Sequence, residues 1–478
     1  MARKKKNQES SGEVMSPEEP QMSDIMQETL IALRAKEATK SGPKLSQAFM
    51  SLDDLPQDTN LPLEPFTLQY VFGRKFFKPG TMIEIIGPEH VGKTTLVFSL
   101  IGMCMSANEG KIPALYVNTE GRNKLCAPER IERSLAANKQ LAKSRMKNIL
   151  MLEGHAQKET LEMMDMWCKM QRETMTKNGI PETVPMIVAL DTLSKMMSRS
   201  ESASLGYGGA GDATKKAKGL GESSNLEFSK LLQEWCRARV EFLERYNVFM
   251  IIVSHQNTKI NMTMMPGARP VSDANNKTKI GGNAINQSAV TQFTLTRVES
   301  IMASDKITAL SHVIKLNVLK NSCGPDKRNI LYELRVENMN DTDDTYEQSL
   351  NFNYGLAELF ANKKLYGCSM KTKTKFACRG LGFTGGDITR ADIAKAFLDN
   401  PELIQEAGMQ LNIYGYAPNM VDPAIRNENR EIAAEELVDD EELANAVQSR
   451  GDIEETVGFD IGDTEEEEPV EDDIADEL

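Results

Sequence analysis

The chain has 478 residues, of which 40% are hydrophobic and 26% charged, as is typical of a soluble globular protein. This length allows two or three domains, and no apolar run is long enough to predict a transmembrane helix. Its seven cysteines form no CxxC pair, which argues against a zinc site and a disulfide framework and indicates a reducing compartment. The N-terminus has basic residues but no apolar segment, so no secretory signal is predicted.

Charge is distributed unevenly along the chain. The net charge is −14, but residues 431–478 contain 21 acidic residues and one arginine and so carry −20. The other 430 residues are mildly basic, with a net charge of +6. Two interpretations of the acidic tail stay open. It is a disordered segment that keeps the protein soluble, or it competes within the molecule for a polyanion that the basic body binds.

Residues 1–61 form an N-terminal segment without a predicted core of their own. Residues 1–22 are polar, whereas 23–37 place apolar side chains near helical spacing behind a serine that can cap a helix. Two partners for this short helix stay open. It packs against its own body, or it packs against a neighbouring subunit and acts as a polymerisation helix.

Residues 62–345 alternate between apolar runs and helical patterns. The runs are almost continuous in apolar residues, as expected for strands that are buried on both faces. They lie at 82–86, 114–118, 148–152, 185–190 and 248–254. The helical patterns between them lie at 93–107, 127–138, 157–176 and 224–245. This alternation predicts an α/β fold with a mostly parallel central sheet covered by helices.

Three further apolar segments follow with little helix between them, and predict a partly antiparallel continuation of the sheet. They span 290–298, 312–320 and 329–337. Two connections, 200–223 and 257–281, are longer than most loops of compact domains, which is typical of functional or disordered segments. We expect residues 346–430 to form a small mixed α+β C-terminal domain and 431–478 to form a disordered acidic tail.

A glycine loop follows the first of the buried strands. The segment "GPEHVGKTT" matches the GxxxxGK[ST] pattern, with an apolar strand before it and a helical pattern after it. The glycines let the backbone N–H groups point at phosphate oxygens, and the helix N-terminus adds its positive dipole end. We expect a nucleotide site formed by Gly87, Pro88, Glu89, His90, Val91, Gly92, Lys93, Thr94 and Thr95. In it Lys93 reaches the β- and γ-phosphates of ATP, and the Thr94 hydroxyl is placed for Mg²⁺.

Two carboxylates end neighbouring predicted strands. Asp191 closes "MIVALD" and is the second expected magnesium residue. Glu120 follows "ALYVNT" directly, so its carboxylate is expected to face the γ-phosphate side of the site as a base for water. The alternative for Glu120 is a helix cap or a surface acid.

Five blocks together resemble the bacterial RecA recombinases. They are the segment from "LPLEPF" through "GPEHVGKTTL", then "YVNTE", "IVALDT", "VFMIIVSHQ" and "KIGGNAI", in the same order and at similar spacing. The resemblance covers about residues 62–337 and implies a RecA-like P-loop ATPase core. It is closer in core order than in detail, so a diverged protein encoded by a phage is one expectation. The resemblance assigns Lys93, Thr94 and Asp191 to the nucleotide and magnesium, and Glu120 to catalysis.

The resemblance also implies roles for three residues outside the P-loop. Gln256 in "SHQ" is similar to the glutamine that senses the γ-phosphate. His255 stands where the family usually has Asn, and is interpreted as a packed imidazole or as a phosphate or DNA contact. Lys320 in "NVLKNS" resembles a lysine that reaches the neighbouring subunit's γ-phosphate, whereas Ser322 replaces a second such lysine. Asn286 and Gln287 replace a basic–aromatic pair at the family's subunit contact.

The two long connections match the positions of the family's DNA-binding loops. A glycine-rich segment with lysines and arginines spread along it is suited to bind DNA phosphates, and this binding gains free energy from counterion release. Such contacts do not depend on the base sequence of the DNA. The expected DNA-binding residues are Lys215, Lys216, Lys218, Lys259, Ile260, Met264, Met265, Arg269, Lys277 and Lys279. The family inserts apolar side chains between bases here; this chain offers Ile260 and two methionines but lacks the common aromatic.

The sequence therefore predicts a DNA-dependent ATPase that uses ATP and Mg²⁺. It is expected to form a helical filament on single-stranded DNA and to exchange strands with a duplex. Possible mediator proteins are further partners, and a bacterial or infected-host cytoplasm is the expected location. Two alternatives stay open: a hexameric helicase with the same core, or a loader or regulator that binds ATP without recombining DNA.

Overall fold

The computed structural model describes residues 60–107, 112–121, 128–154, 156–196, 222–258, 277–279, 282–336, 340–383 and 388–416. Within some of these ranges, at 222–228, 257–258, 277–279 and 282–283, only the backbone is described. The predicted N-terminal helix and the acidic tail lie outside these ranges. Among the described residues no helix is both long and apolar enough to cross a membrane.

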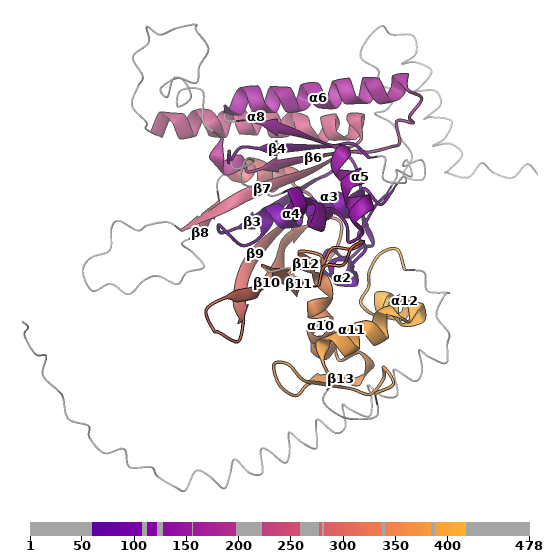
Figure 1. Ribbon diagram of the computed structural model, residues 1–478. Coiled ribbons are helices and arrows are strands. Elements are labelled where there is room, and N and C mark those ends of the chain that lie inside the picture. Colours follow the sequence, from indigo (N-terminus) through magenta and orange to yellow (C-terminus); the bar gives the residue numbers. More distant parts are fainter. Residues whose placement is uncertain are drawn as a thin grey trace, which may run out of the picture. The chain divides into compact units, whose positions relative to one another are not determined.

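A ten-stranded sheet runs through the described chain, in the order β12-β11-β10-β9-β3-β7-β6-β4-β5, with β8 paired to β7 (Figure 1). The strands from β9 to β5 along this order are parallel, whereas β9 to β12 are joined by antiparallel pairs. The strands are β3 (Met82–Gly87), β4 (Ala114–Asn118), β5 (Ile149–Glu153), β6 (Met186–Asp191), β7 (Val248–Thr258), β8 (Lys277–Lys279), β9 (Thr291–Met302), β10 (Ala309–Asn321), β11 (Asn329–Arg335) and β12 (Leu350–Asn351). The mostly parallel sheet predicted from the apolar runs is confirmed.

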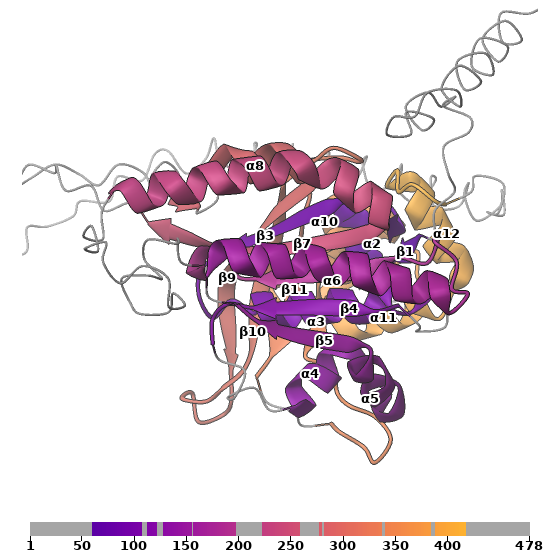
Figure 2. The same ribbon diagram turned by 90° about the horizontal axis from the view of Figure 1, so that it is seen from above.

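One face of the sheet is covered by long helices. These are α6 (Gln157–Lys177) and α8 (Glu222–Tyr246) (Figures 1 and 2). The short α9 (Gly282–Ser288) adds Ile285 to the apolar cluster on this face. Leu161, Met164 and Leu232 pack there against strand residues in one apolar cluster. A bidentate ion pair between Arg239 and Asp165 joins α8 to α6. Because this face is closed by packing, polar chemistry is left to the edges of the sheet.

The opposite face is covered by α3 (Lys93–Cys104), α2 (Phe66–Phe72) and the C-terminal helices. Ten of the twelve residues of α3 are buried, so this helix is enclosed on almost all sides. The adjoining helices are α4 (Pro128–Leu135) and α5 (Lys139–Lys147). The small strands β1 (Leu61–Pro62) and β2 (Phe76–Phe77) pair with each other beside α2.

The C-terminal segment packs on the same apolar cluster as α2 and α3. Its elements are α10 (Leu356–Lys363), β13 (Cys368–Met370), β14 (Phe376–Cys378), α11 (Arg390–Leu398) and α12 (Pro401–Gln410). The Phe397 ring lies 5.0 Å from the Phe66 ring and 4.8 Å from the Phe360 ring, centroid to centroid. Strand β12 adds to the main sheet through β11. The predicted boundary at residue 345/346 stays a prediction.

One expectation about the cysteines is wrong. Cys368 and Cys378 form a disulfide across the β13–β14 pair, where they are register partners. Their spacing in the sequence gave no sign of this, because antiparallel pairing rather than a CxxC motif brings them together. Among the described residues Cys104, Cys168 and Cys236 are free and buried, and Cys323 is free and exposed.

Candidate functional site at the carboxyl edge of the sheet

The glycine loop curls between β3 and α3. Gly92 adopts a φ of 84°, which side-chain-bearing residues rarely take, and a Cβ there would lie 2.8 Å from Leu334 Cδ2. His90 also has a positive φ, of 58°, and its carbonyl accepts a 2.6 Å hydrogen bond from Arg297. No side chain caps the start of α3. The loop is therefore shaped by packing on β11 and β9, and the first amides of α3 are left for another acceptor.

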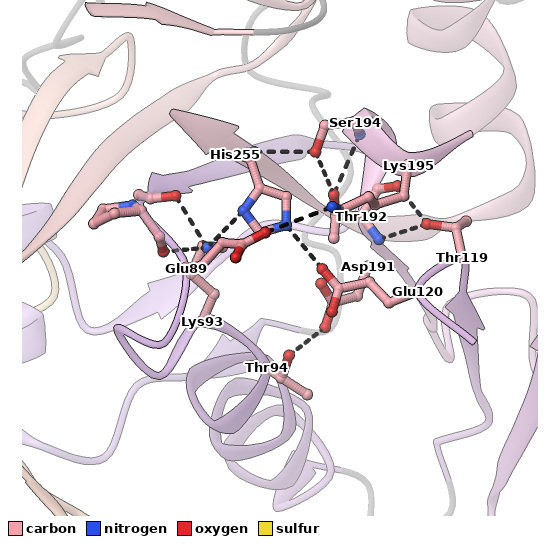
Figure 3. Close-up of polar contacts among 12 residues, drawn as sticks. Glu89, Lys93, Thr94, Thr119, Glu120, Asp191, Thr192, Ser194, Lys195 and His255 are labelled. Carbon is pink, nitrogen blue, oxygen red and sulfur yellow. Dashed lines mark hydrogen bonds and ion pairs between the residues drawn. The ribbon is translucent and has the colours of Figure 1, made fainter. Parts of the chain in front are cut away.

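Lys93 points back into this loop rather than out to solvent. Its ammonium donates to the carbonyls of Gly87 (3.0 Å) and Pro88 (2.5 Å) and lies 3.2 Å from His255 Nδ1 (Figure 3). Burial lowers the pKa of Lys93 to about 8, against the raising effect of Asp191 and Glu120. An ammonium that is held by neutral carbonyls in a desolvated site is well suited to exchange them for an anion.

Asp191 lies at the end of β6 with its side chain almost fully buried. Its Oδ2 accepts from the Thr94 hydroxyl at 2.6 Å and from the Tyr116 hydroxyl at 2.9 Å. Burial raises the pKa of this carboxyl, whereas the two hydroxyl donors lower it. Thr94 and Asp191 were predicted from separate motifs, and the fold brings them into direct contact. Tyr116 was not predicted; a tyrosine inside the apolar run "ALYVN" was the one available signal.

Glu120 lies just beyond the end of β4. Its backbone N–H donates to Asn118 Oδ1 at 2.9 Å, which fixes the turn that follows the strand. Its carboxylate Oε1 lies 2.8 Å from His255 Nε2. The side chains of Glu120 and His255 are 17% and 9% exposed, so this contact is largely shielded from water. Glu120 is therefore held at the site edge by a strand end on one side and an imidazole on the other.

His255 connects Lys93 to Glu120 (Figure 3). An ammonium has only donors, so His255 Nδ1 accepts from Lys93, and Nε2 then carries the proton that is donated to Glu120. The backbone N–H of His255 donates to Ser194 Oγ at 3.3 Å. The sequence left His255 as a packed imidazole or as a phosphate or DNA contact. In the structure His255 has these two side-chain partners inside the site, and its role toward phosphate or DNA stays a prediction.

Parallel strand ends explain why these residues meet. Asn118 and Asp191 are register partners of β4 and β6, and Gly87 and His255 are register partners of β3 and β7. The carboxyl ends of neighbouring parallel strands lie on one edge of a sheet, where ligands of open α/β folds bind. A pocket of about 290 Å³ opens there. It is lined by Glu89, His90, Gly92, Lys93, Thr94, Thr95, Phe98, Tyr116, Asn118, Glu120, Arg130, Ile131, Ser134, Asp191 and His255.

Of the other predicted residues that the structure describes here, Glu89 and Thr95 line this pocket, whereas Val91 and Gln256 are not part of its lining. Glu89 Oε1 lies 3.5 Å from Lys195 Nζ in an exposed ion pair. Val91 is buried against the core, and Thr95 is buried in the first turn of α3. Gln256 follows His255 in β7 and is the register partner of Lys279 in β8. The structure thus places Gln256 on the ribbon that leaves the site.

Lys320 lies in β10, away from the pocket lining. Its ammonium donates to the carbonyls of Asn286 at 2.6 Å and Ala289 at 2.7 Å, at the end of α9. Of the predicted DNA-binding residues, only the backbones of Lys277 and Lys279 are described. The others lie outside the described residues: Lys215, Lys216, Lys218, Lys259, Ile260, Met264, Met265 and Arg269.

The residues around the pocket fit a nucleoside triphosphate with Mg²⁺. Lys93 and the first amides of α3 offer donors for phosphate oxygens, and the Thr94 hydroxyl and Asp191 carboxylate offer oxygen ligands of the kind that Mg²⁺ prefers. Arg130 and Ile131 of α4 line the far side of the pocket. Sequence reasoning missed both, because α4 carries no motif and only its packing brings it here.

Comparison with known proteins gives one weak relationship. No protein-family model matches the chain. The chain is 21% identical over 305 residues to protein RecA of Nautilia profundicola, covering 64% of this chain and 73% of that protein. This similarity is compatible with the mixed α/β architecture and its mostly parallel sheet. The chain is thus distantly similar to RecA.

Proposed function

We propose that this protein is an ATPase of the RecA type that assembles on single-stranded DNA and catalyses homologous pairing and strand exchange. One observation carries the ATPase part of the proposal. The side chains of Lys93, Thr94, Glu120 and Asp191, predicted from three separate segments, line one pocket at the carboxyl edge of the sheet. The distant similarity to RecA supports the recombination part.

We assign each residue a task that its geometry supports. Lys93 exchanges its carbonyl partners for the β- and γ-phosphates, since an anion is a better acceptor for a desolvated ammonium than a neutral carbonyl. Glu120, oriented by the His255 Nε2 proton, accepts a proton from the attacking water. Thr94 and Asp191 would hold Mg²⁺, which when bound neutralises charge on the phosphates. Asn118 fixes Glu120, because its side-chain Oδ1 accepts from the backbone N–H of Glu120.

Contact with DNA is supported by the charge of the body and by one described surface. Residues 363–380 contain six basic residues and no acidic residue. All six are exposed, around the β13–β14 pair: Lys363, Lys364, Lys371, Lys373, Lys375 and Arg379. A polyanion is the natural ligand of such a surface. The two loops predicted to bind single-stranded DNA, 200–223 and 257–281, remain part of the proposal.

Substitution Glu120→Gln tests the assignment of the base. The amide keeps the size of the side chain but cannot take up the proton, so ATP turnover on single-stranded DNA should fall by about 10²–10⁴-fold. Because the triphosphate still binds, the variant should retain ATP-dependent DNA binding, measured by fluorescence anisotropy of a labelled oligonucleotide. Strand exchange between a circular single strand and a linear duplex is then compared for the two proteins.

Glu153→Gln is the matched control, because Glu153 ends the neighbouring strand β5 and is not part of the pocket lining. We expect near wild-type turnover. Similar losses in both variants would count against Glu120 as the base.

Electron micrographs with ATP and single-stranded DNA separate the three classes of protein. A helical filament supports the recombinase, closed rings indicate a helicase, and the absence of both forms indicates a loader or regulator.

A further inference from the structure

A carboxylate lies buried in the middle of β3. Glu84 is 0% exposed, and the strand around it reads "MIEIIG", otherwise apolar or glycine. Taking a carboxylate out of water costs several kcal/mol unless hydrogen bonds replace its hydration. Neither phosphate binding nor water activation uses this residue. A buried carboxylate in a central strand, without a part in the proposed chemistry, therefore points to a task of another kind.

Both carboxylate oxygens of Glu84 are hydrogen-bonded, each to a different neighbouring strand. Oε1 accepts from Ser254 Oγ of β7 at 2.7 Å, and Oε2 accepts from Gln292 Nε2 of β9 at 2.6 Å. Strand β3 lies between these two strands, and Glu84 and Gln292 are register partners. One carboxylate thus joins three adjacent strands side chain to side chain, in addition to their backbone ladders.

The β9 arm of this network continues to α9. Gln292 Nε2 also donates to Asn286 Oδ1 at 2.9 Å, and the Asn286 carbonyl accepts from Lys320 at 2.6 Å. Lys320 is itself the register partner of Gln292 in β10. Ile285 of α9 is fully buried in the apolar cluster beneath α8. The position of α9 is therefore tied to β9 and β10 by directional polar contacts.

The β7 arm leads to the nucleotide site. Ser254 and His255 are consecutive in β7, so their side chains point to opposite faces of the sheet. Ser254 bonds to Glu84, whereas His255 bonds to Lys93 and Glu120. Beyond them β7 pairs with β8, which precedes α9 in the chain. Two routes therefore connect the end of β7 to α9: the hydrogen bonds through Glu84, and the chain that leads from the β7–β8 pair into α9.

We propose that Glu84 is a positioning residue that couples the occupancy of the nucleotide site to the position of α9. When Lys93 leaves His255 for a phosphate, the end of β7 loses a contact on one face, and the Ser254–Glu84–Gln292–Asn286 chain transmits the change to α9 on the other. This inference rests on the proposed function for the nucleotide, but it requires no DNA. It makes α9 the responding element, directly after the loop 257–281.

Amide hydrogen exchange of residues 282–289, measured with and without an ATP analogue that is not hydrolysed, tests the coupling. Couplings between sites are commonly five- to 150-fold, so we expect nucleotide to slow exchange there by about tenfold in the wild type. Substitution Glu84→Met keeps the volume but removes both acceptors, and should reduce the ratio to below about twofold. Nucleotide affinity, measured with a fluorescent analogue, should stay within about threefold.

Two further variants separate coupling from simple packing. Glu84→Gln keeps both contacts, because its oxygen accepts from Gln292 while its N–H donates to the Ser254 hydroxyl, which can rotate to accept. It should restore the wild-type exchange ratio. Met82→Leu, on the same strand and face and 1% exposed, changes packing alone and should leave the ratio unchanged. Should Glu84→Met not fold, Ser254→Ala and Gln292→Leu each remove one arm, and both should lower the ratio.

The inference would be overturned if Glu84→Met, or both single-arm variants, showed the same exchange ratio as the wild type. It would also be overturned if bound nucleotide left the exchange of residues 282–289 in the wild type unchanged, which is a ratio of one. Failure of the wild type to bind the analogue at all is a different result. It would overturn the proposed ATPase function first, and would be seen in the binding assay before any exchange is measured.

Discussion

The two halves of the sheet differ in what their strands deliver. The parallel half, from β3 to β5 along the sheet order, brings Lys93, Glu120, Asp191 and His255 together at one edge of the sheet. The antiparallel half and the C-terminal helices instead bury aromatic side chains, with Tyr332 fully buried and near the Phe352 ring. Parallel strands all end on the same side, so their polar ends accumulate, whereas antiparallel strands alternate direction and contribute mainly packing.

The halves are nevertheless joined at the glycine loop. Leu334 of β11 packs against Gly92, and Arg297 of β9 donates to the His90 carbonyl. The shape of the glycine loop thus depends on strands β9 and β11, which contribute no side chain to the proposed catalysis. We call strands β9 to β12 with the C-terminal helices the scaffold half, and the parallel strands β3 to β5 the chemical half. Three predictions test how far these two halves are independent.

The largest expected effect is on stability, from Leu334→Ala in the scaffold half. Leu334 is 5% exposed in the main core, and removal of a buried leucine side chain commonly costs about 2–5 kcal/mol in the free energy of unfolding. Chemical denaturation of the nucleotide-free protein measures this loss. Because the same side chain supports Gly92, ATP affinity should also weaken, by about threefold to tenfold.

Leu316→Ala is the control, since Leu316 is 0% exposed in β10 of the same half and lines no part of the nucleotide pocket. It should destabilise the protein comparably and leave ATP affinity unchanged. If both variants bind ATP as tightly as the wild type, the glycine loop does not depend on β11, and the two halves are independent there.

The second effect is a pH dependence in the chemical half. Burial lowers the pKa of Lys93 to about 8 in the nucleotide-free protein, and a bound triphosphate favours its charged form and raises that pKa. Binding therefore takes up a proton at pH values above 8. ATP affinity should be nearly constant below this pH and should fall by about fivefold to tenfold between pH 7.5 and 9.

Titration calorimetry with Mg²⁺–ATP in buffers of different ionisation enthalpy measures both the affinity and the proton uptake. In Lys93→Arg the guanidinium stays charged throughout this range, so the dependence should disappear even if the affinity is lower at every pH. The same slope in the variant and the wild type would assign the titration to another group.

The smallest effect is expected from His255→Asn. The shorter amide cannot hold both Lys93 and Glu120, so Glu120 loses part of its orientation and kcat should fall by about threefold to tenfold. Because Lys93 leaves His255 when a phosphate binds, KM for ATP should not rise. His312→Asn is the control, since His312 bonds to Ser300 outside the pocket lining. A rise in KM with unchanged kcat would contradict the assigned role.

Much of the site could be predicted from the sequence, because its motifs are local. The glycine loop from Gly87 to Thr95 is contiguous, and Asp191 and Glu120 each follow an apolar run that reads as a buried strand. The same runs predicted the parallel sheet, since strands covered on both faces need continuous apolar sequence. Element ends differed by only a few residues; the helix predicted at 93–107 is Lys93–Cys104.

Other features depended on contacts between distant segments. The Cys368–Cys378 disulfide follows from strand pairing, and the bond between His255 and Glu120 joins residues 135 positions apart. Glu84 reads in the sequence as a lone acid in an apolar strand, without partners. The amino-acid sequence by itself determined which strands are buried and where a phosphate loop begins, because both are periodic or contiguous patterns. Only the tertiary structure decided which polar groups pair, because register and packing, rather than spacing along the chain, set the distances over which hydrogen bonds form.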